Sequence, residues 1–138
     1  MRYLAIDYGN KRIGLAICDA SETISSPLTV IDAAKDPINR IVEIVAQENV
    51  GAIVVGMPLN MDDSQGPQAK VTIEFAKRLE KHVDIDILFQ DERLSSFAAE
   101  EKMAPAEFSW KKKRKHLDAV AAAQILETFL ENHHTASQ

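Results

Sequence analysis

Short apolar runs alternate with longer amphipathic stretches along the chain. The runs are rich in β-branched residues and have the length of strands, and they occur at residues 2–7, 13–19, 24–31, 52–55 and 85–89. The run at 52–55 is apolar throughout, which is typical of a central parallel strand. The pattern predicts an α/β fold in which the first two strands form a hairpin.

The stretches between these runs have helical spacing. Asp36 followed by Pro37 predicts the N-terminus of a helix that ends near residues 49–51. A second helix follows Pro67, with its apolar stripe formed by Val71, Phe75, Ala76 and Leu79 and with Glu74, Lys77, Arg78 and Lys81 facing water. A last helix is predicted over residues 117–130.

The rest of the C-terminal third has weaker signals. Ser95 or Ser96 can cap a short helix that ends before Pro105, and the stretch from there to Lys115 is interpreted as a mobile loop because it lacks periodicity. The last helix is rich in small residues at 119–123, so it should pack closely on its neighbours. We expect one domain over residues 1–132 and a flexible tail over 133–138.

Length and composition fit one reduced, cytoplasmic domain. The chain has 138 residues, of which 46% are hydrophobic, and this is enough for one sizeable core. Cys18 is the one cysteine, so no internal disulfide can form. No signal-like segment or long apolar run occurs, so no membrane contact is expected.

The charge is unevenly distributed. The formal net charge is −5, which argues against a general nucleic-acid binder. However, residues 111–115 (Lys-Lys-Lys-Arg-Lys) carry five of the 16 basic residues, and removing these five positive charges leaves −10 on the rest of the chain. Any contact with a polyanion is therefore expected to be local.

Three acidic positions are predicted to converge. Asp7 ends the first strand, before a turn in which Gly9 and Gly14 allow close backbone approach; Glu92 follows the fifth strand, and Asp118 opens the last helix. Ligand sites of open α/β sheets collect at the carboxyl ends of strands, and three oxygen ligands suit Mg²⁺ or Mn²⁺. Taken alone, Asp7 is more typical of a turn-capping aspartate, and alternation leaves Asp91 or Glu92 open as the second ligand.

Four motifs in order then resemble a known family. They are Asp7-Tyr8-Gly9-Asn10-Lys11-Arg12-Ile13-Gly14-Leu15-Ala16, Val55-Gly56-Met57-Pro58-Leu59-Asn60, Asp91-Glu92-Arg93-Leu94-Ser95 and Asp118-Ala119-Val120-Ala121-Ala122. The chain resembles the YqgF-type pre-16S rRNA nucleases, which are also described as Holliday-junction-resolvase-like, over about residues 2–131.

The resemblance implies a ribonuclease H-like fold, with a central mixed five-stranded sheet flanked by helices. It also implies a metal-dependent nuclease that acts in 5′-end processing of precursor 16S rRNA, with Asp7, Glu92 and Asp118 as catalytic residues and ligands of two divalent ions. The residues expected to contact nucleic acid are Lys11, Arg12, Asn60, Arg93, Lys111, Lys112, Lys113, Arg114 and Lys115.

Other functions remain open from the sequence. The better-known junction resolvases carry a fourth metal ligand three residues before the final aspartate, where this chain has Lys115, so RNA processing is favoured over a DNA junction resolvase. An ATPase or sugar kinase would need a second phosphate-binding hairpin. A non-catalytic RNA-binding module would use the same acidic edge and basic segment. Monomer and homodimer are both compatible with the sequence.

Overall fold

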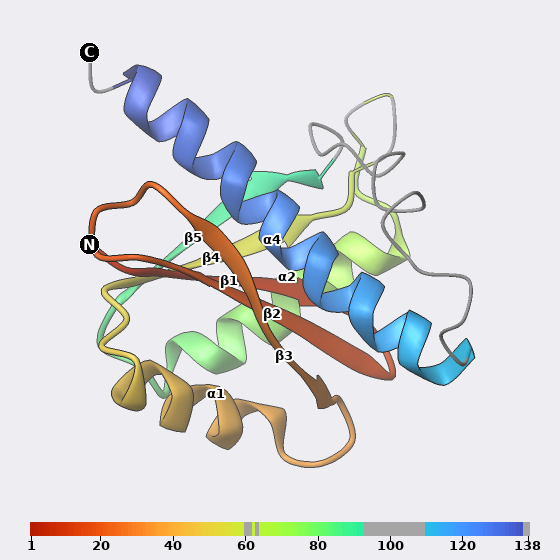
Figure 1. The fold of residues 1–138 in the computed structure, drawn as a ribbon. Helices are drawn as coiled ribbons and strands as arrows, with labels where there is room; N and C mark the ends of the chain where they lie inside the picture. Colours follow the sequence, from red (N-terminus) through yellow and green to blue (C-terminus); the bar gives the residue numbers. More distant parts are fainter. Residues whose placement is uncertain (60–61, 63, 93–109, 137–138) are drawn as a thin grey trace.

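The computed structural model describes residues 1–59, 62, 64–92 and 110–136, with side chains of the last helix described for residues 118–133. Five strands form one sheet in the order β3-β2-β1-β4-β5 (Figure 1). The strands are β1 (Tyr3–Tyr8), β2 (Arg12–Cys18), β3 (Ser25–Asp32), β4 (Ala52–Met57) and β5 (Asp86–Asp91). The helices are α1 (Pro37–Gln47), α2 (Pro67–Glu80) and α4 (Trp110–Ala136).

The sheet is mixed, as the sequence predicts. Strands β1, β2 and β3 are antiparallel, whereas β4 pairs in parallel with both β1 and β5. The three parallel strands therefore end at the same edge of the sheet, where Asp7 and Glu92 lie. This sheet with its helices confirms the mixed five-stranded architecture expected from the sequence.

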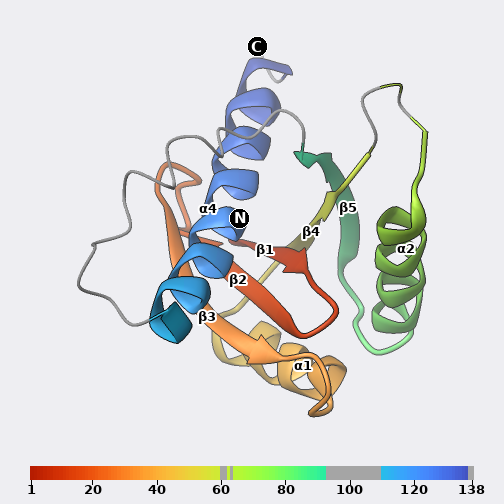
Figure 2. The same cartoon turned by 90° about the vertical axis from the view of Figure 1, so that its right-hand side faces the viewer.

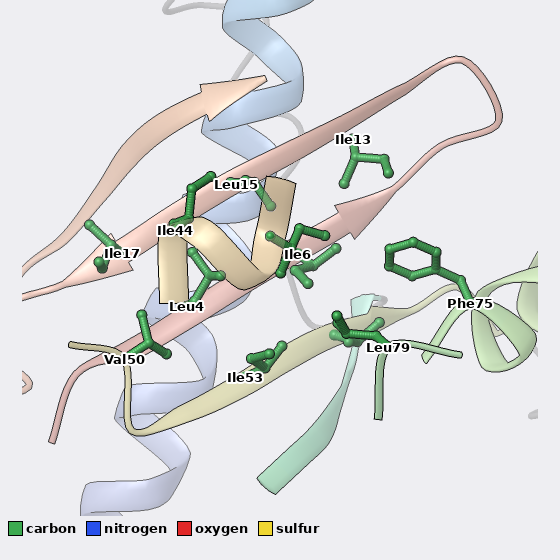
Figure 3. Close-up of a cluster of buried hydrophobic side chains, with 12 residues drawn as sticks. Leu4, Ile6, Ile13, Leu15, Ile17, Ile44, Val50, Ile53, Phe75 and Leu79 are labelled. Atoms are coloured by element: carbon green, nitrogen blue, oxygen red, sulfur yellow. The ribbon is translucent and has the colours of Figure 1, made fainter. Parts of the chain in front are cut away.

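Each face of the sheet packs on its own layer of helices (Figure 2). One face carries alternate strand residues such as Leu4, Ile6 and Ile53, which pack against α1 and α2 (Figure 3). On the other face, Tyr3 and Ala5 belong to a cluster with residues of α4. The period of two in the strands thus divides the apolar residues between two cores.

Helix α4 buries a row of alanines on the sheet, which confirms the close packing expected from their small side chains. It begins at Trp110, however, so residues 110–116 are helical and not the predicted loop. Lysine and arginine are good helix formers even where no apolar stripe marks the helix. The helix also continues to Ala136, where the sequence predicts a tail from His133. The predicted short helix near Ser95 lies outside the described residues.

Two details of α1 and α2 differ from the sequence interpretation. Asp36 stands at the N-cap of α1 but has a left-handed backbone and makes no side-chain capping bond; its carboxylate accepts a 2.6 Å hydrogen bond from Asn39. In α2, Val71 is 36% exposed, and Thr72 takes the inward position with its hydroxyl bonded to the Gln68 carbonyl. A hydroxyl can be buried there because it donates its hydrogen bond to a carbonyl of the helix backbone.

Among the described residues, no helix combines the length and apolar content that crossing a membrane requires.

Ile53 and Ile24 provide a matched test of this packing. Ile53 is fully buried between the sheet and the helices, whereas Ile24 is 63% exposed. We expect Ile53→Ala to lower the free energy of unfolding by about 2–5 kcal/mol, because it removes apolar contacts and leaves a cavity. Ile24→Ala should change it by no more than about 0.5 kcal/mol. Urea denaturation compares the two, and equal losses would contradict this packing.

Candidate active site

Asp7 lies near the end of β1, on the sheet face that α4 covers. In the antiparallel pair, Asp7 is directly opposite Gly14 of β2. On its other side, Ile6 pairs with Val55 of β4, so the next residue, Gly56, flanks Asp7 in the parallel direction. Asp7 is therefore the side chain between two glycines, which leave space beside its carboxylate.

Gly14 allows α4 to approach the sheet. A Cβ atom at this position would overlap the backbone carbonyl oxygen of Asp118, so no other residue fits without moving the helix. The glycine has no positive φ, so it is required by this close approach and not by backbone conformation. This contact between helix and strand fixes where Asp118 enters the site.

Gly56 makes the corresponding space for Glu92. A Cβ atom at Gly56 would lie 2.6 Å from Oε1 of Glu92 and 2.6 Å from Cδ1 of Ile125. The Glu92 side chain thus passes over β4 and reaches Asp7, to which it is hydrogen-bonded. Because Glu92 makes this contact, the geometry favours it over Asp91 as the partner of Asp7.

The surroundings of Asp7 and Glu92 disfavour the charged form of each carboxyl group, so the pKa of both is raised. Burial, followed by the negative charge of Asp7 and the hydrogen bond to it, raises the pKa of Glu92 to about 8. Burial also raises the pKa of Asp7, with the hydrogen bond to Glu92 acting in the opposite direction and the charge of Asp118 adding to the rise. The hydrogen bond between the two carboxyl groups therefore raises the pKa of Glu92 and partly offsets the rise that burial causes at Asp7.

Asp118 has a basic partner. Nε of Arg12, at the start of β2, donates a 2.7 Å hydrogen bond to Oδ2 of Asp118. Both side chains are about one-third exposed, so solvent weakens the ion pair while the short, charge-assisted bond keeps the two groups oriented. Arg12, which was predicted to contact phosphate, thus lies against a predicted metal ligand.

The carboxyl groups fit a hard divalent cation in donor chemistry. Oxygen ligands suit Mg²⁺ and Mn²⁺, and a cation would offset the charge that raises the pKa of Asp7 and Glu92. Across the described parts of the chain, however, no three His, Cys, Asp or Glu side chains form a preformed metal site. The close acidic pair is Asp7 and Glu92, while Asp118 is held by Arg12.

The other residues predicted to contact nucleic acid divide into those whose side chains the structure describes and those whose side chains it does not. Lys11 is exposed on the turn between β1 and β2. Asn60, Arg93 and the side chains of residues 111–115 lie outside the described residues, although the backbone of 111–115 forms the first turns of α4. The sequence analysis missed the role of Gly56; a glycine within an otherwise β-branched strand was the available signal.

The chain matches the family model described as "RuvX: Holliday junction resolvase" over residues 1–132. A protein of Maridesulfovibrio salexigens named "Putative pre-16S rRNA nuclease" is 41% identical over 132 residues, which cover 94% of this chain and 98% of the relative. A protein of Roseiflexus sp. with the same name is 39% identical over 133 residues, covering 95% and 94%.

Two solved structures share the fold. The Fowlpox virus resolvase in complex with Holliday junction DNA has a TM-score of 0.60 at 13% identity and covers 96% of this chain and 98% of its own. T. thermophilus RuvC in complex with a Holliday junction substrate has a TM-score of 0.55 at 16% identity, with 97% and 96% covered. At these identities the likeness concerns the fold alone.

Gly56→Ala tests the space that Glu92 requires. The added methyl group would collide with Glu92 and Ile125, so we expect a loss of about 1–3 kcal/mol in the free energy of unfolding. Gly51→Ala is the control, because its methyl group would meet the exposed side chain of Met1, which can rotate away. Chemical denaturation of both variants gives the comparison, and a neutral Gly56→Ala would show that the site is not tightly packed.

The acidic pair also predicts how stability depends on pH without metal. From pH 4.5 to about 8, folded Glu92 keeps a proton that the unfolded chain has released, so the free energy of unfolding falls as the pH rises. Asp7→Asn removes the charge next to Glu92, so the free energy of unfolding should fall less steeply with pH. At pH 8 the Tm of the variant should then lie several degrees above that of the parent, since about 1 kcal/mol shifts the Tm of such a domain by about 4 °C.

Thermal denaturation in chelator from pH 5 to pH 8 measures this effect. Asp84→Asn serves as the control because Asp84 is exposed in the turn before β5, and it should keep the slope of the parent. The same slope in the parent and in Asp7→Asn would contradict the coupling between Asp7 and Glu92.

Proposed function

The chain belongs to the RuvX family, and on this premise we propose that it is a divalent-metal-dependent nuclease that hydrolyses phosphodiester bonds of precursor 16S rRNA. The observation that carries the proposal is the partly buried pair of Asp7 and Glu92 at the carboxyl end of parallel strands, with Asp118 nearby. The curated relatives cover nearly the whole chain and carry the rRNA nuclease name. Processing of rRNA in turn favours a cytoplasmic location.

Asp7 and Glu92 are the residues proposed to hold Mg²⁺ or Mn²⁺, with Asp118 as the third donor. Bound divalent ions supply activation of water and stabilisation of the leaving oxygen. The donor set favours these ions because carboxylates match hard cations. Glu92 must lose its proton to act as a ligand, so ion binding and deprotonation of the acidic pair are coupled.

The residues of the chain contribute position and charge. Gly14 lets the backbone at Asp118 approach β2, and Gly56 makes room for Glu92 beside Asp7. These contacts limit how far each carboxyl group can move from a productive position. Arg12 orients the Asp118 carboxylate through its 2.7 Å hydrogen bond. In the reaction, the oxygen of a water molecule bonds to phosphorus, the bond from phosphorus to the 3′-oxygen breaks, and that oxygen takes up a proton.

The basic segment 111–115 is proposed to contact phosphates that flank the cleaved bond. It forms the first turns of α4, the helix that also carries Asp118. The backbone therefore brings the segment to the same end of the molecule as the turn between β1 and β2 (Figure 1). Contacts of this kind act mainly through release of counterions and weaken as salt rises.

A second candidate is resolution of DNA four-way junctions, which the description of the matching family favours. Such a junction has two-fold symmetry, so paired cuts would require a dimer with two sites. Lys115, in place of a fourth acidic ligand, argues against this alternative. Selective cleavage of junctions over single-stranded RNA would replace our proposal with it.

Asp7→Asn tests the proposal directly. We expect loss of metal-dependent cleavage of labelled precursor-rRNA leader by at least about 100-fold, with binding retained, because removing a direct ligand should cost more than the 10- to 100-fold typical of outer-shell partners. The assay compares Mg²⁺, Mn²⁺ and chelator on RNA, DNA and four-way junctions. Asp84→Asn, at an exposed turn, is the matched control and should cleave like the parent.

Cleavage that survives in Asp7→Asn would remove Asp7 from the catalytic site. If the parent binds RNA but cleaves no substrate with either metal, the chain is a non-catalytic RNA-binding module and the proposal fails.

A further inference from the structure

A groove of about 650 Å³ opens beside the acidic site, between two connected loops. One wall is the turn between β1 and β2, which contributes Asn10, Lys11 and Arg12; the other is the end of β3 with the turn that follows it, through Lys35. The volume is within the range of about 300–1,000 Å³ that is typical of ligand sites. The sequence analysis did not single out Lys35.

The two walls are tied together by backbone hydrogen bonds. Arg12 pairs with Asp32 across β2 and β3, and the Ala33 amide donates a 2.9 Å bond to the Lys11 carbonyl. The Asp32 carboxylate accepts a 2.8 Å bond from the Ala34 amide, so it closes the turn. Because the walls are joined in this way, the groove is a built feature of the fold and its basic residues keep their relative positions.

The charge of the groove matches a polyanion. Lys11 and Lys35 are exposed, and Arg12 also lines the groove, whereas Asp32 is the acidic residue among the lining residues. Val30, Ile31 and Ala34 add apolar surface that a sugar or base can contact. Exposed lysines beside such a surface can contact the phosphates of a nucleic-acid strand through release of counterions.

Arg12 joins the groove to the acidic site. Its side chain lines the groove, and its Nε is bonded to Asp118. Figure 2 shows the turn between β1 and β2, the end of β3 and the first turns of α4 at one end of the molecule. A strand that lies in the groove would therefore contact the residue that is bonded to Asp118.

We propose that this groove binds the nucleic-acid strand next to the cleaved phosphodiester, with Lys11 and Lys35 as phosphate contacts. The proposal rests on the proposed nuclease function, to which it adds the path of the substrate and the role of Lys35. The occupant is the sugar-phosphate backbone of a single strand, because exposed lysines recognise charge without reading sequence.

Binding of labelled single-stranded RNA in chelator, followed by fluorescence anisotropy at increasing salt, tests the groove. Each contact contributes about 0.7 to the slope of log K against log salt, which equals about fivefold in affinity at about 0.1 M salt. We expect Lys11→Gln and Lys35→Gln each to show this loss and this smaller slope, and the double variant to lose about 25-fold. Lys77→Gln, on the exposed face of α2, should bind like the parent.

The outcomes separate the groove from the nuclease. If the parent cleaves RNA but both groove variants bind like Lys77→Gln, the groove proposal is overturned while the nuclease stands. If the parent never cleaves but its binding depends on Lys11 and Lys35, the groove stands and the nuclease fails. AMP added as a competitor tests for a mononucleotide site. If AMP displaces the RNA, and if its own affinity falls in both variants as the RNA affinity does, the groove is a mononucleotide site and the proposal is overturned.

Discussion

The contact between the backbones of helix α4 and strand β2 determines where the acidic site can form. Gly14 leaves no side chain between them, so the carbonyl of Asp118 rests on the strand itself. The buried alanines of α4 extend the same close approach along the helix. If a side chain separated the helix from the sheet, Asp118 would lie further from Asp7. The same residues would be present, but they would no longer have the geometry of the site.

This geometry has an electrostatic consequence. Asp7 and Glu92 lie together and partly buried, and burial raises the pKa of both carboxyl groups. The ion pair that Arg12 makes is with Asp118. The folded chain therefore retains a site that is unfavourable in isolation and that favours a positively charged ligand. Such local instability is expected where residues are arranged for binding or catalysis and not for packing.

The sequence predicts the fold well because its strands are short apolar runs rich in β-branched residues and its first two helices begin at prolines. It also predicts that Asp7 lies near the end of a buried strand, but alternation alone could not choose between Asp91 and Glu92. That choice depends on the open space above Gly56, which is a tertiary property. The start of α4 at Trp110 and the inward Thr72 were also missed. Neither a run of lysine and arginine nor a hydroxyl bonded to its own helix backbone produces an apolar stripe.

The position of Arg12 links recognition to chemistry. The residue begins β2 only two positions before Gly14, so the strand that admits α4 also carries the cation that holds Asp118. The backbone of the same turn is bonded to the connection after β3, which brings Lys35 to the groove. Arg12 thus lines the groove and is at the same time engaged by Asp118. Under the proposed function, a phosphate in the groove would attract the guanidinium, and a divalent ion would attract the carboxylate of the same ion pair. Either ligand would then weaken the pair and favour binding of the other, which would couple substrate and metal without any movement of the sheet.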